Sequence, residues 1–305
     1  MDELKISATA HGLNYLPEYF AADRGLFAAQ DLSVTATAKD PWTGVLDDLD
    51  SGAADIALGG LWVPGMYWGT PRELTVFAQL NHQFPKALVV RGDAEGFGWA
   101  DLVGATVLAP GIGGSAPYAF TAGLIREAGL DPADMTFLRD LSTPMFVELF
   151  EAGLGDAIVL DMTTAQILQD RGSGAIAIDY TEVGGLGPNS VYYLRTDRYD
   201  ELADRLVRFT TALEQAMRAV RTVPLAELEP LLAAHWPGIA TETLLRSCAR
   251  IKSSGTWDTV RIDAGASDRW MRILAQEKMV PTAPAFADLI DTRVVDSLEL
   301  ARAAH

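Results

Sequence analysis

The sequence predicts an α/β fold in two lobes, each with a mixed sheet flanked by helices. The first observation is a repeat, because LDDLDSGAADIALGG (residues 46–60) and VELFEAGLGDAIVLDM (residues 147–162) share one pattern. In each copy an amphipathic run ends in small residues and glycine, and an aspartate then opens an apolar strand, Asp55 in one and Asp156 in the other. The second observation is that strands alternate with short helices around both copies, which is typical of parallel sheets built from right-handed crossovers.

The segments upstream of the two copies follow one order, namely strand, loop, helix and second strand. We expect these elements at residues 5–10, 11–17, 18–27 and 32–38 in the first copy, and at 105–110, 111–118, 119–129 and 135–140 in the second. Gly25 and Gly129 end the two helices. Asp55 and Asp156 are expected to be structural, because they mark strand starts far from the carboxyl ends, where open sheets of this kind bind ligands.

Two apolar strands, residues 86–92 and 189–197, are expected to cross between the lobes and form a hinge. We therefore expect a first lobe of residues 1–90 plus 192–305 and a second lobe of residues 91–191. From Arg198 onward, apolar residues recur at spacings of three and four between Pro and Gly signals, which predicts helices. Each helix has one apolar face, which favours packing on the first lobe over a separate partner-binding module.

The composition of the chain excludes several classes of protein. Of 305 residues, 49% are hydrophobic and 21% charged, as in folded globular chains. The net charge of −17 argues against nucleic acid as a partner. No apolar run reaches the roughly 20 residues that span a bilayer, so we expect no direct membrane insertion. Cys248 is the single cysteine, and its helical context predicts a buried, inert thiol.

The start of the chain bears on localisation. Met1, Asp2 and Glu3 precede the first strand, without the basic and apolar regions of a secretory leader. The sequence is thus compatible with a cytoplasmic protein, or with a periplasmic or cell-surface protein whose leader has been removed.

The segment YLPEYFAADRGLFAAQDLSVTATA, followed by LDDLDSGAADIALGG, resembles the opening of the periplasmic solute-binding proteins for nitrate, alkanesulfonates, taurine and pyrimidine thiamine precursors. Asp31-Leu32 stands where that family usually has Gly-Leu. The resemblance covers most of residues 4–200. It implies a type II periplasmic-binding-protein-like fold with two hinge crossings, a small-molecule ligand between the lobes and a permease of an ABC importer as partner. We expect the protein to act as a monomer.

Candidate ligand-binding residues of the first lobe follow its strands. They are Asn14, Tyr15, Trp42, Thr43, Gly60 and Trp62. An aromatic residue at each of three successive strand ends favours a ring-stacking site over simple packing. The expected ligand is therefore flat, aromatic or heterocyclic, with an acidic group as an open alternative.

Candidates in the second lobe begin with Gly113, Gly114, Ser115 and Tyr118, in a loop before a helix. Glycine N–H groups and a helix N-terminus suit an anionic or carbonyl group. Ser115 either touches the ligand or caps the helix, and Asp161 either binds a ligand amine or caps the helix that follows. Asn189 and Tyr192, at the second crossing, complete the expected site.

His82 lies beside the first crossing, where it either contacts the ligand, acts as a base or is satisfied by the backbone. The rival of a binding protein is a cytoplasmic enzyme, since the family resemblance extends to a pyridoxal-phosphate-dependent pyrimidine synthase, a desulfinase and a decarboxylase. The synthase's cysteine-rich stretch is absent, and Cys248 lies in the wrong region for the desulfinase nucleophile. A pyrimidine-synthase-like enzyme and a cofactor-free decarboxylase using His82 remain the alternatives. The histidines lack metal-ligand spacing, so no metal or cofactor is expected.

Overall fold

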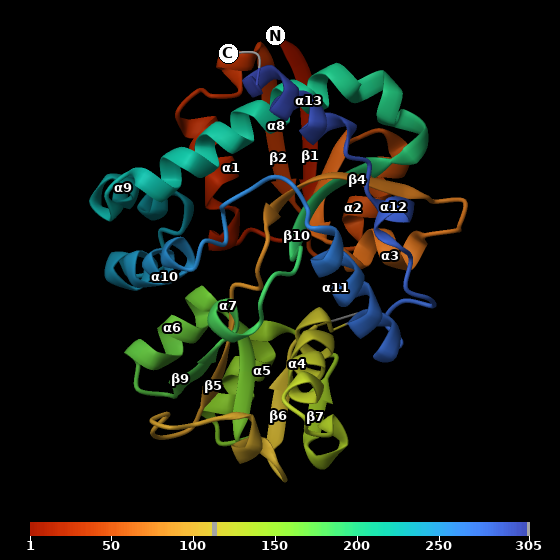
Figure 1. Ribbon diagram of the computed structural model, residues 1–305. Helices are drawn as coiled ribbons and strands as arrows, with labels where there is room; N and C mark the ends of the chain where they lie inside the picture. The colour runs from red at the N-terminus through yellow and green to blue at the C-terminus, as the bar shows by residue number, and fades with distance from the viewer. Residues whose placement is uncertain (112–114, 304–305) are drawn as a thin grey trace.

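A computed structural model describes residues 1–111 and 115–303 of the chain, and its two lobes lie one above the other in Figure 1. Each lobe is built on a five-stranded mixed sheet. Both termini lie at the far end of the first lobe, away from the second. The predicted α/β two-lobed architecture is confirmed.

The two sheets have the same topology. The first has the order β2 (Leu32–Ala38), β1 (Asp2–Ala8), β3 (Ile56–Gly60), β10 (Ser190–Arg195) and β4 (Leu74–Asn81). The second has the order β7 (Thr136–Arg139), β6 (Thr106–Ala109), β8 (Ala157–Asp161), β5 (Lys86–Val90) and β9 (Ala175–Asp179). In each, three parallel strands are followed by an antiparallel strand at the fourth position. The repeat read from the sequence is therefore a repeat of structure.

Asp55 and Asp156 perform the same structural task in the two lobes. The Asp55 carboxylate accepts a hydrogen bond from the Lys5 backbone N–H at 3.0 Å, and Asp156 accepts one from Thr106 at 2.7 Å. Each aspartate thereby ties the start of one strand to its parallel neighbour, Asp55 to the middle of β1 and Asp156 to the start of β6. The expectation that both are structural is confirmed.

Helices connect the parallel strands of each lobe. The first lobe contains α1 (Leu16–Asp23), α2 (Gly44–Ser51) and α3 (Trp62–Tyr67), and the second contains α4 (Ala116–Glu127), α5 (Thr143–Glu151), α6 (Met162–Asp170) and α7 (Tyr180–Val183). The tail contains α8 (Tyr199–Thr222), α9 (Leu225–His235), α10 (Thr241–Ser253), α11 (Ala264–Gln276), α12 (Phe286–Leu289) and α13 (Arg293–Ala303). No helix of the described ranges is long and apolar enough to cross a membrane.

The lobe boundary differs from the one expected at residues 90 and 192. β5 pairs with β8 and β9 in the second sheet, and β10 pairs with β3 and β4 in the first. The connections between the sheets are therefore the segments 82–85 and 180–189, and neither strand itself spans the lobes. Strand periodicity identifies β5 as a strand, but it carries no information on which sheet the strand joins.

The helical tail packs on both lobes, whereas the sequence predicts packing on the first alone. α8 lies against α1, and α13 against α8 and β4, as expected. α10, however, also contacts α6, and α11 contacts α4, on opposite sides of the hinge in Figure 1. The tail therefore bridges the lobes on two sides.

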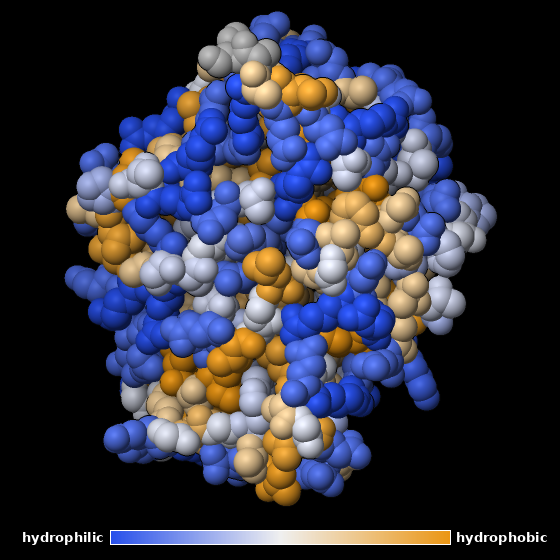
Figure 2. Space-filling model, viewed as in Figure 1, coloured by the Kyte–Doolittle hydropathy of each residue, from blue (hydrophilic) through white to orange (hydrophobic). Residues whose placement is uncertain are grey.

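Both faces of the central strands are buried, whereas the edge strands β2 and β7 are largely exposed. In β8, Ile158 and Leu160 join one apolar cluster while Ala157 and Val159 join the other, because successive side chains point to opposite faces. Helices on both faces account for the continuously apolar strands. On the surface shown in Figure 2, hydrophilic residues predominate and apolar residues form smaller groups over both lobes.

Candidate functional site

A cleft of about 760 Å³ separates the lobes and opens where the parallel strands of both sheets end. Its size falls in the range of small-molecule sites. The first lobe contributes residues that follow β1, β2 and β3, and the second contributes residues that follow β6, β7 and β8. The repeat thus brings equivalent loops of the two lobes to one cavity.

Seven of the fourteen candidate residues line this cleft, namely Asn14, Tyr15, Trp42, Gly60, Trp62, Asp161 and Asn189. Gly113 and Gly114 lie outside the described residues. The five others, Thr43, His82, Ser115, Tyr118 and Tyr192, are not part of the cleft wall formed by the described residues.

An aromatic pair forms one wall on the first lobe. The rings of Trp42 and Trp62 meet edge to face, with centroids 4.6 Å apart and planes at 79°. Gly60 permits this arrangement, because a Cβ at that position would collide with the Trp62 indole. Edge-to-face pairs are a favourable aromatic geometry, and both tryptophans remain partly exposed. The pair therefore presents aromatic surface to the cavity.

Polar side chains from the hinge form the floor. The Asn14 amide donates to Asn81 Oδ1 at 2.9 Å, while Asn81 and the Trp257 indole donate to the Asn14 carbonyl at 2.8 and 2.9 Å. The Asn189 amide donates to Ser190 Oγ at 3.1 Å. The Asn14 amide also donates to Ser190 Oγ at 3.4 Å, so hydrogen bonds join the loop after β1 to both crossings.

A buried carboxyl group lies behind this floor. Glu18 on α1 is 3% exposed and accepts a hydrogen bond from Tyr192 Oη at 2.6 Å. Burial raises the pKa of Glu18 to about 7, and the hydrogen bond from Tyr192 opposes that rise. Tyr15 lines the cleft, and burial raises the pKa of its hydroxyl group. The nearby Glu18 carboxylate raises this pKa further.

The second lobe contributes a lysine and a capping aspartate. Lys86 at the start of β5 lies opposite Asp161 at the end of β8. Asp161 accepts hydrogen bonds from the backbone N–H groups of Thr163 and Thr164, at 3.1 and 3.0 Å, and from the Thr164 hydroxyl at 2.7 Å. Of the two roles predicted for Asp161, helix capping is therefore present. Burial lowers the pKa of Lys86, and Asp161 counteracts this shift.

Ser115 and Tyr118 serve the structure of α4. Ser115 Oγ accepts a hydrogen bond from the Tyr118 backbone N–H at 3.1 Å and donates to the Pro110 carbonyl at 3.0 Å, which makes it the N-cap. The Tyr118 ring packs edge to face on Phe137 and under Arg139. Tyr118 therefore belongs to the packing of the second lobe.

Thr43, His82 and Tyr192 were expected in the site and lie elsewhere. Thr43 is exposed at the start of α2. His82 follows Asn81, and alternation directs it away from the floor, toward the loop that holds Thr256 and Asp258. Burial lowers the pKa of His82.

Tyr192 shares a sheet face with the cleft residue Ser190 but lies two residues deeper in β10. Its ring is buried against Phe77 and Phe209 in the core of the first lobe. The prediction from the strand end is therefore wrong for Tyr192, because only the first residue of β10 reaches the cleft.

Part of the cleft comes from residues that strand ends do not predict. Trp236 and Ile239 follow α9, and Ile251 belongs to α10. At this side of the cleft, His11 Nδ1 and Tyr19 Oη share a hydrogen bond of 3.0 Å. The His11 ring packs on Trp236, with ring centroids 5.1 Å apart. No local sequence signal locates these residues, because they reach the cleft only through the packing of the tail.

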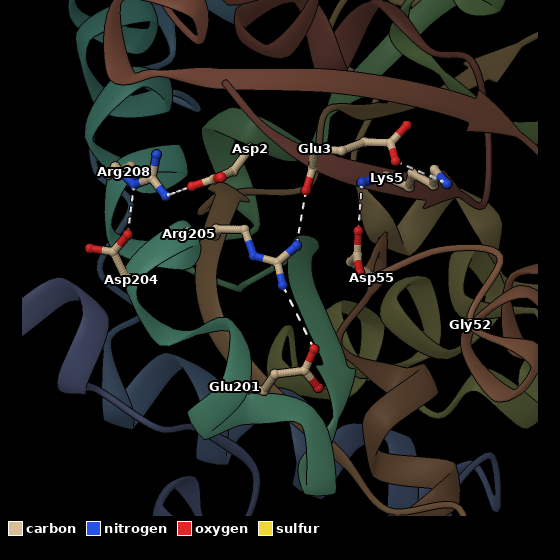
Figure 3. Close-up of a pocket in the computed structure, with 9 residues that line it drawn as sticks. All are labelled: Asp2, Glu3, Lys5, Gly52, Asp55, Glu201, Asp204, Arg205 and Arg208. Carbon is tan, nitrogen blue, oxygen red and sulfur yellow. Dashed lines mark hydrogen bonds and ion pairs between the residues drawn. The ribbon is translucent and has the colours of Figure 1, made fainter.

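A second hollow, of about 470 Å³, lies beside the starts of β1 and β3 in the first lobe, at the end of these strands away from the cleft (Figure 3). Its cations are paired within the hollow, since Arg208 contacts Asp204 and Asp2, and Arg205 contacts Glu201. Exposed pairs of this kind contribute little free energy and leave no cation available for a ligand. We therefore assign the functional site to the cleft between the lobes.

The fold of the chain is similar to that of solved two-lobed binding proteins. The structure superimposes on the periplasmic aliphatic sulphonate-binding protein of Escherichia coli with a TM-score of 0.73 at 16% identity, over 93% of this chain and 95% of that one. It superimposes on the ligand-binding component of an ABC-type import system from Staphylococcus aureus with a TM-score of 0.77 at 13% identity, over 96% and 98%. Identities this low show a shared fold.

Comparison of sequences identifies one curated relative and one family. The presumed binding protein YtlA of Bacillus subtilis is 26% identical over 227 residues, which are 72% of this chain and 66% of that protein, just under two thirds of its length. Residues 13–226, more than half of the chain, match the family described as NMT1/THI5 like. The chain therefore belongs to the NMT1/THI5-like family.

Proposed function

We propose that the protein is a solute-binding protein of the ABC-importer type, which holds a small, flat organic ligand with an acidic group between its lobes. The observation that carries this proposal is the cleft of about 760 Å³ whose walls come from equivalent strand ends of two repeated lobes. Family membership and the fold shared with importer components support it.

The first-lobe wall supports a flat ligand. Trp42 and Trp62 offer ring surface, and stacking on aromatic side chains favours planar partners. The amide and hydroxyl groups of Asn14, Asn189 and Ser190 at the floor supply the few polar groups that orient a ligand in an otherwise apolar site.

The second-lobe wall supports an acidic group on that ligand. The first residues of three helices line the cleft, Ala116 of α4, Thr143 of α5 and Met162 of α6. The N-termini of α4 and α5, which have neutral serine caps, carry partial positive charge and favour anions, whereas the Asp161 carboxylate compensates the N-terminus of α6. Lys86 lies on the same wall.

The decarboxylase and desulfinase alternatives lack their reactive groups in this geometry. His82, the candidate base of a decarboxylase, is absent from the described lining of the cleft. Burial raises the pKa of Cys248 to about 12, so its thiol is protonated and poorly nucleophilic. We therefore propose binding without a chemical step.

The proposed role also requires a partner and a location. The protein would deliver its ligand as a monomer to a membrane permease, and would meet that ligand in the periplasm or at the cell surface. Cell fractionation of the native host with an antibody to the protein tests this location, and recovery in the cytoplasmic fraction alone would contradict the transport role.

The ligand-binding proposal is tested by thermal denaturation with aromatic carboxylates, sulfonates and pyrimidines at millimolar concentration. A ligand that binds the folded state raises the melting temperature by mass action. Trp62→Ala should weaken the binding of any hit by about tenfold or more, because a stacking surface is lost. Trp68→Ala is the matched control, since Trp68 is 37% exposed and lies outside the lining of the cleft.

If no compound of the panel changes the melting temperature, the proposed function is wrong. Each hit is also incubated with the protein and analysed by mass spectrometry. If a product forms catalytically, the protein is an enzyme and the proposal of binding without a chemical step is wrong.

A further inference from the structure

Two lysines line the cleft in the described part of the chain, and they differ in their partners. Lys39 forms an ion pair with Asp48, with 2.7 Å between Nζ and Oδ2. Lys86 takes part in no ion pair of the described residues, although it too lines the cavity. One cleft cation is therefore neutralised by the protein and the other is not.

The acid nearest to Lys86 along the sheet is already engaged. Asp161, its register partner on β8, directs one oxygen to two backbone N–H groups of α6 and the other to the Thr164 hydroxyl. Its negative charge therefore compensates the N-terminus of α6. Asp161 opposes the lowering of the Lys86 pKa without forming a contact ion pair with the ammonium group.

Such an ammonium group is costly in the unliganded protein. Lys86 is half-buried at the cleft end of the second lobe, and its partial desolvation lowers the pKa of its amine. A desolvated charge without a counter-ion destabilises a protein unless something else pairs with it. The chain also carries a net charge of −17, so an anion is repelled at long range and needs a local cation to be held.

We propose that Lys86 is the residue that selects acidic ligands, by pairing its ammonium group with the carboxylate or sulfonate of the molecule in the cleft. This inference rests on the proposed function and assigns its anion specificity to one side chain. The N-termini of α4 and α5 on the same wall add favourable potential, while Trp42 and Trp62 contact the remainder of the ligand.

The test uses pairs of probes that differ in charge but little in shape, namely nicotinate with nicotinamide, and benzenesulfonate with benzenesulfonamide. Isothermal titration gives the affinity for each, and the ratio of acid to amide affinity is the readout. We expect the wild-type protein to prefer the acids by about tenfold or more, because hydrogen bonds to charged groups contribute roughly 1.5–3 kcal/mol. Lys86→Met should abolish this preference and leave amide affinity within about twofold.

Lys39→Met is the matched control. Because Asp48 neutralises Lys39, this substitution should lower the ratio of acid to amide affinity by much less than Lys86→Met does. Thermal denaturation without probes adds a second readout. We expect Lys86→Met to be as stable as the wild type or more stable, since it removes a desolvated charge, whereas loss of a structural ion pair would lower the melting temperature.

Acid preference that persists in Lys86→Met would overturn this inference and leave the proposed function intact. Acids and amides that bind the wild type equally would overturn this inference and also the acidic group of the proposed ligand, while the binding role itself would stand. A melting temperature of Lys86→Met clearly below that of the wild type would assign Lys86 a structural role and also overturn it. If neither member of either pair binds and the broader panel also fails, both proposals are wrong.

Discussion

Glu18 gives a prediction whose size follows from the structure. Its carboxyl group is 3% exposed on α1 and its described hydrogen-bond partner is the Tyr192 hydroxyl. Burial raises its pKa from 4.5 to about 7. Because the folded state holds the proton more tightly than the unfolded chain, its stabilising contribution is complete below pH 4.5. That contribution is lost as the pH rises through 7.

The difference between the two pKa values sets the magnitude. One pKa unit corresponds to about 1.4 kcal/mol, so ionisation of Glu18 should cost about 3 kcal/mol of unfolding free energy above pH 8. Glu18→Gln removes the charge and keeps an oxygen that accepts the Tyr192 hydrogen bond. We expect the variant to match the wild type within about 1 kcal/mol at pH 4.5 and to exceed it by about 3 kcal/mol at pH 8.5.

The assay is urea unfolding followed by tryptophan fluorescence, at intervals between pH 4.5 and 9. Other carboxylates titrate in both proteins, so the quantity of interest is the difference between the two pH profiles. Glu229→Gln, at an exposed position of α9, is the control and should stay within about 0.5 kcal/mol of the wild type throughout. Parallel profiles for Glu18→Gln and the wild type would refute the reasoning.

Three further predictions concern the cleft and its surroundings. Gly60→Ala should weaken ligand binding by about tenfold in titration, because the new Cβ displaces the Trp62 indole, and unchanged affinity would contradict the proposed aromatic wall. Ser115→Ala should lower the unfolding free energy by about 1 kcal/mol through loss of the α4 cap, with ligand affinity retained. Cys248 should react with a thiol reagent only after denaturation, since it is fully buried and its pKa is raised to about 12; rapid labelling of the native protein would contradict this.

The sequence predicts the repeated core of this fold because that core depends on local periodicity. An amphipathic run, a glycine stop and an aspartate before an apolar strand each have a local cause, and both copies fold as expected. Asp55 and Asp156 even accept equivalent backbone hydrogen bonds. The sequence does not show which sheet β5 joins, because an apolar strand that is buried on both faces fits either sheet.

Side-chain direction limits how far the site could be predicted. Strand ends correctly indicate the loops that reach the cleft, including those of Asn14 and Trp42. They do not say which of two consecutive residues points inward. Asn81 hydrogen-bonds to the cleft residue Asn14, whereas His82 bonds to the Thr256 carbonyl, and neither belongs to the described lining of the cleft. Trp236 could not be found in this way, since it reaches the cleft only through the helical tail.

The same tail makes the two lobes parts of one folding unit despite their internal repeat. Trp270 on α11 packs against Phe84 at the first crossing and Phe120 on α4, with ring centroids 4.8 and 5.4 Å away. Both apolar clusters contain residues of both lobes. A single lobe would therefore expose large apolar side chains that the whole chain buries, at roughly 25 cal/mol for each Å² exposed. The repeat accounts for the equivalent loops on the two sides of the cleft. The tail, which is not repeated, packs on both lobes and fixes their relative position.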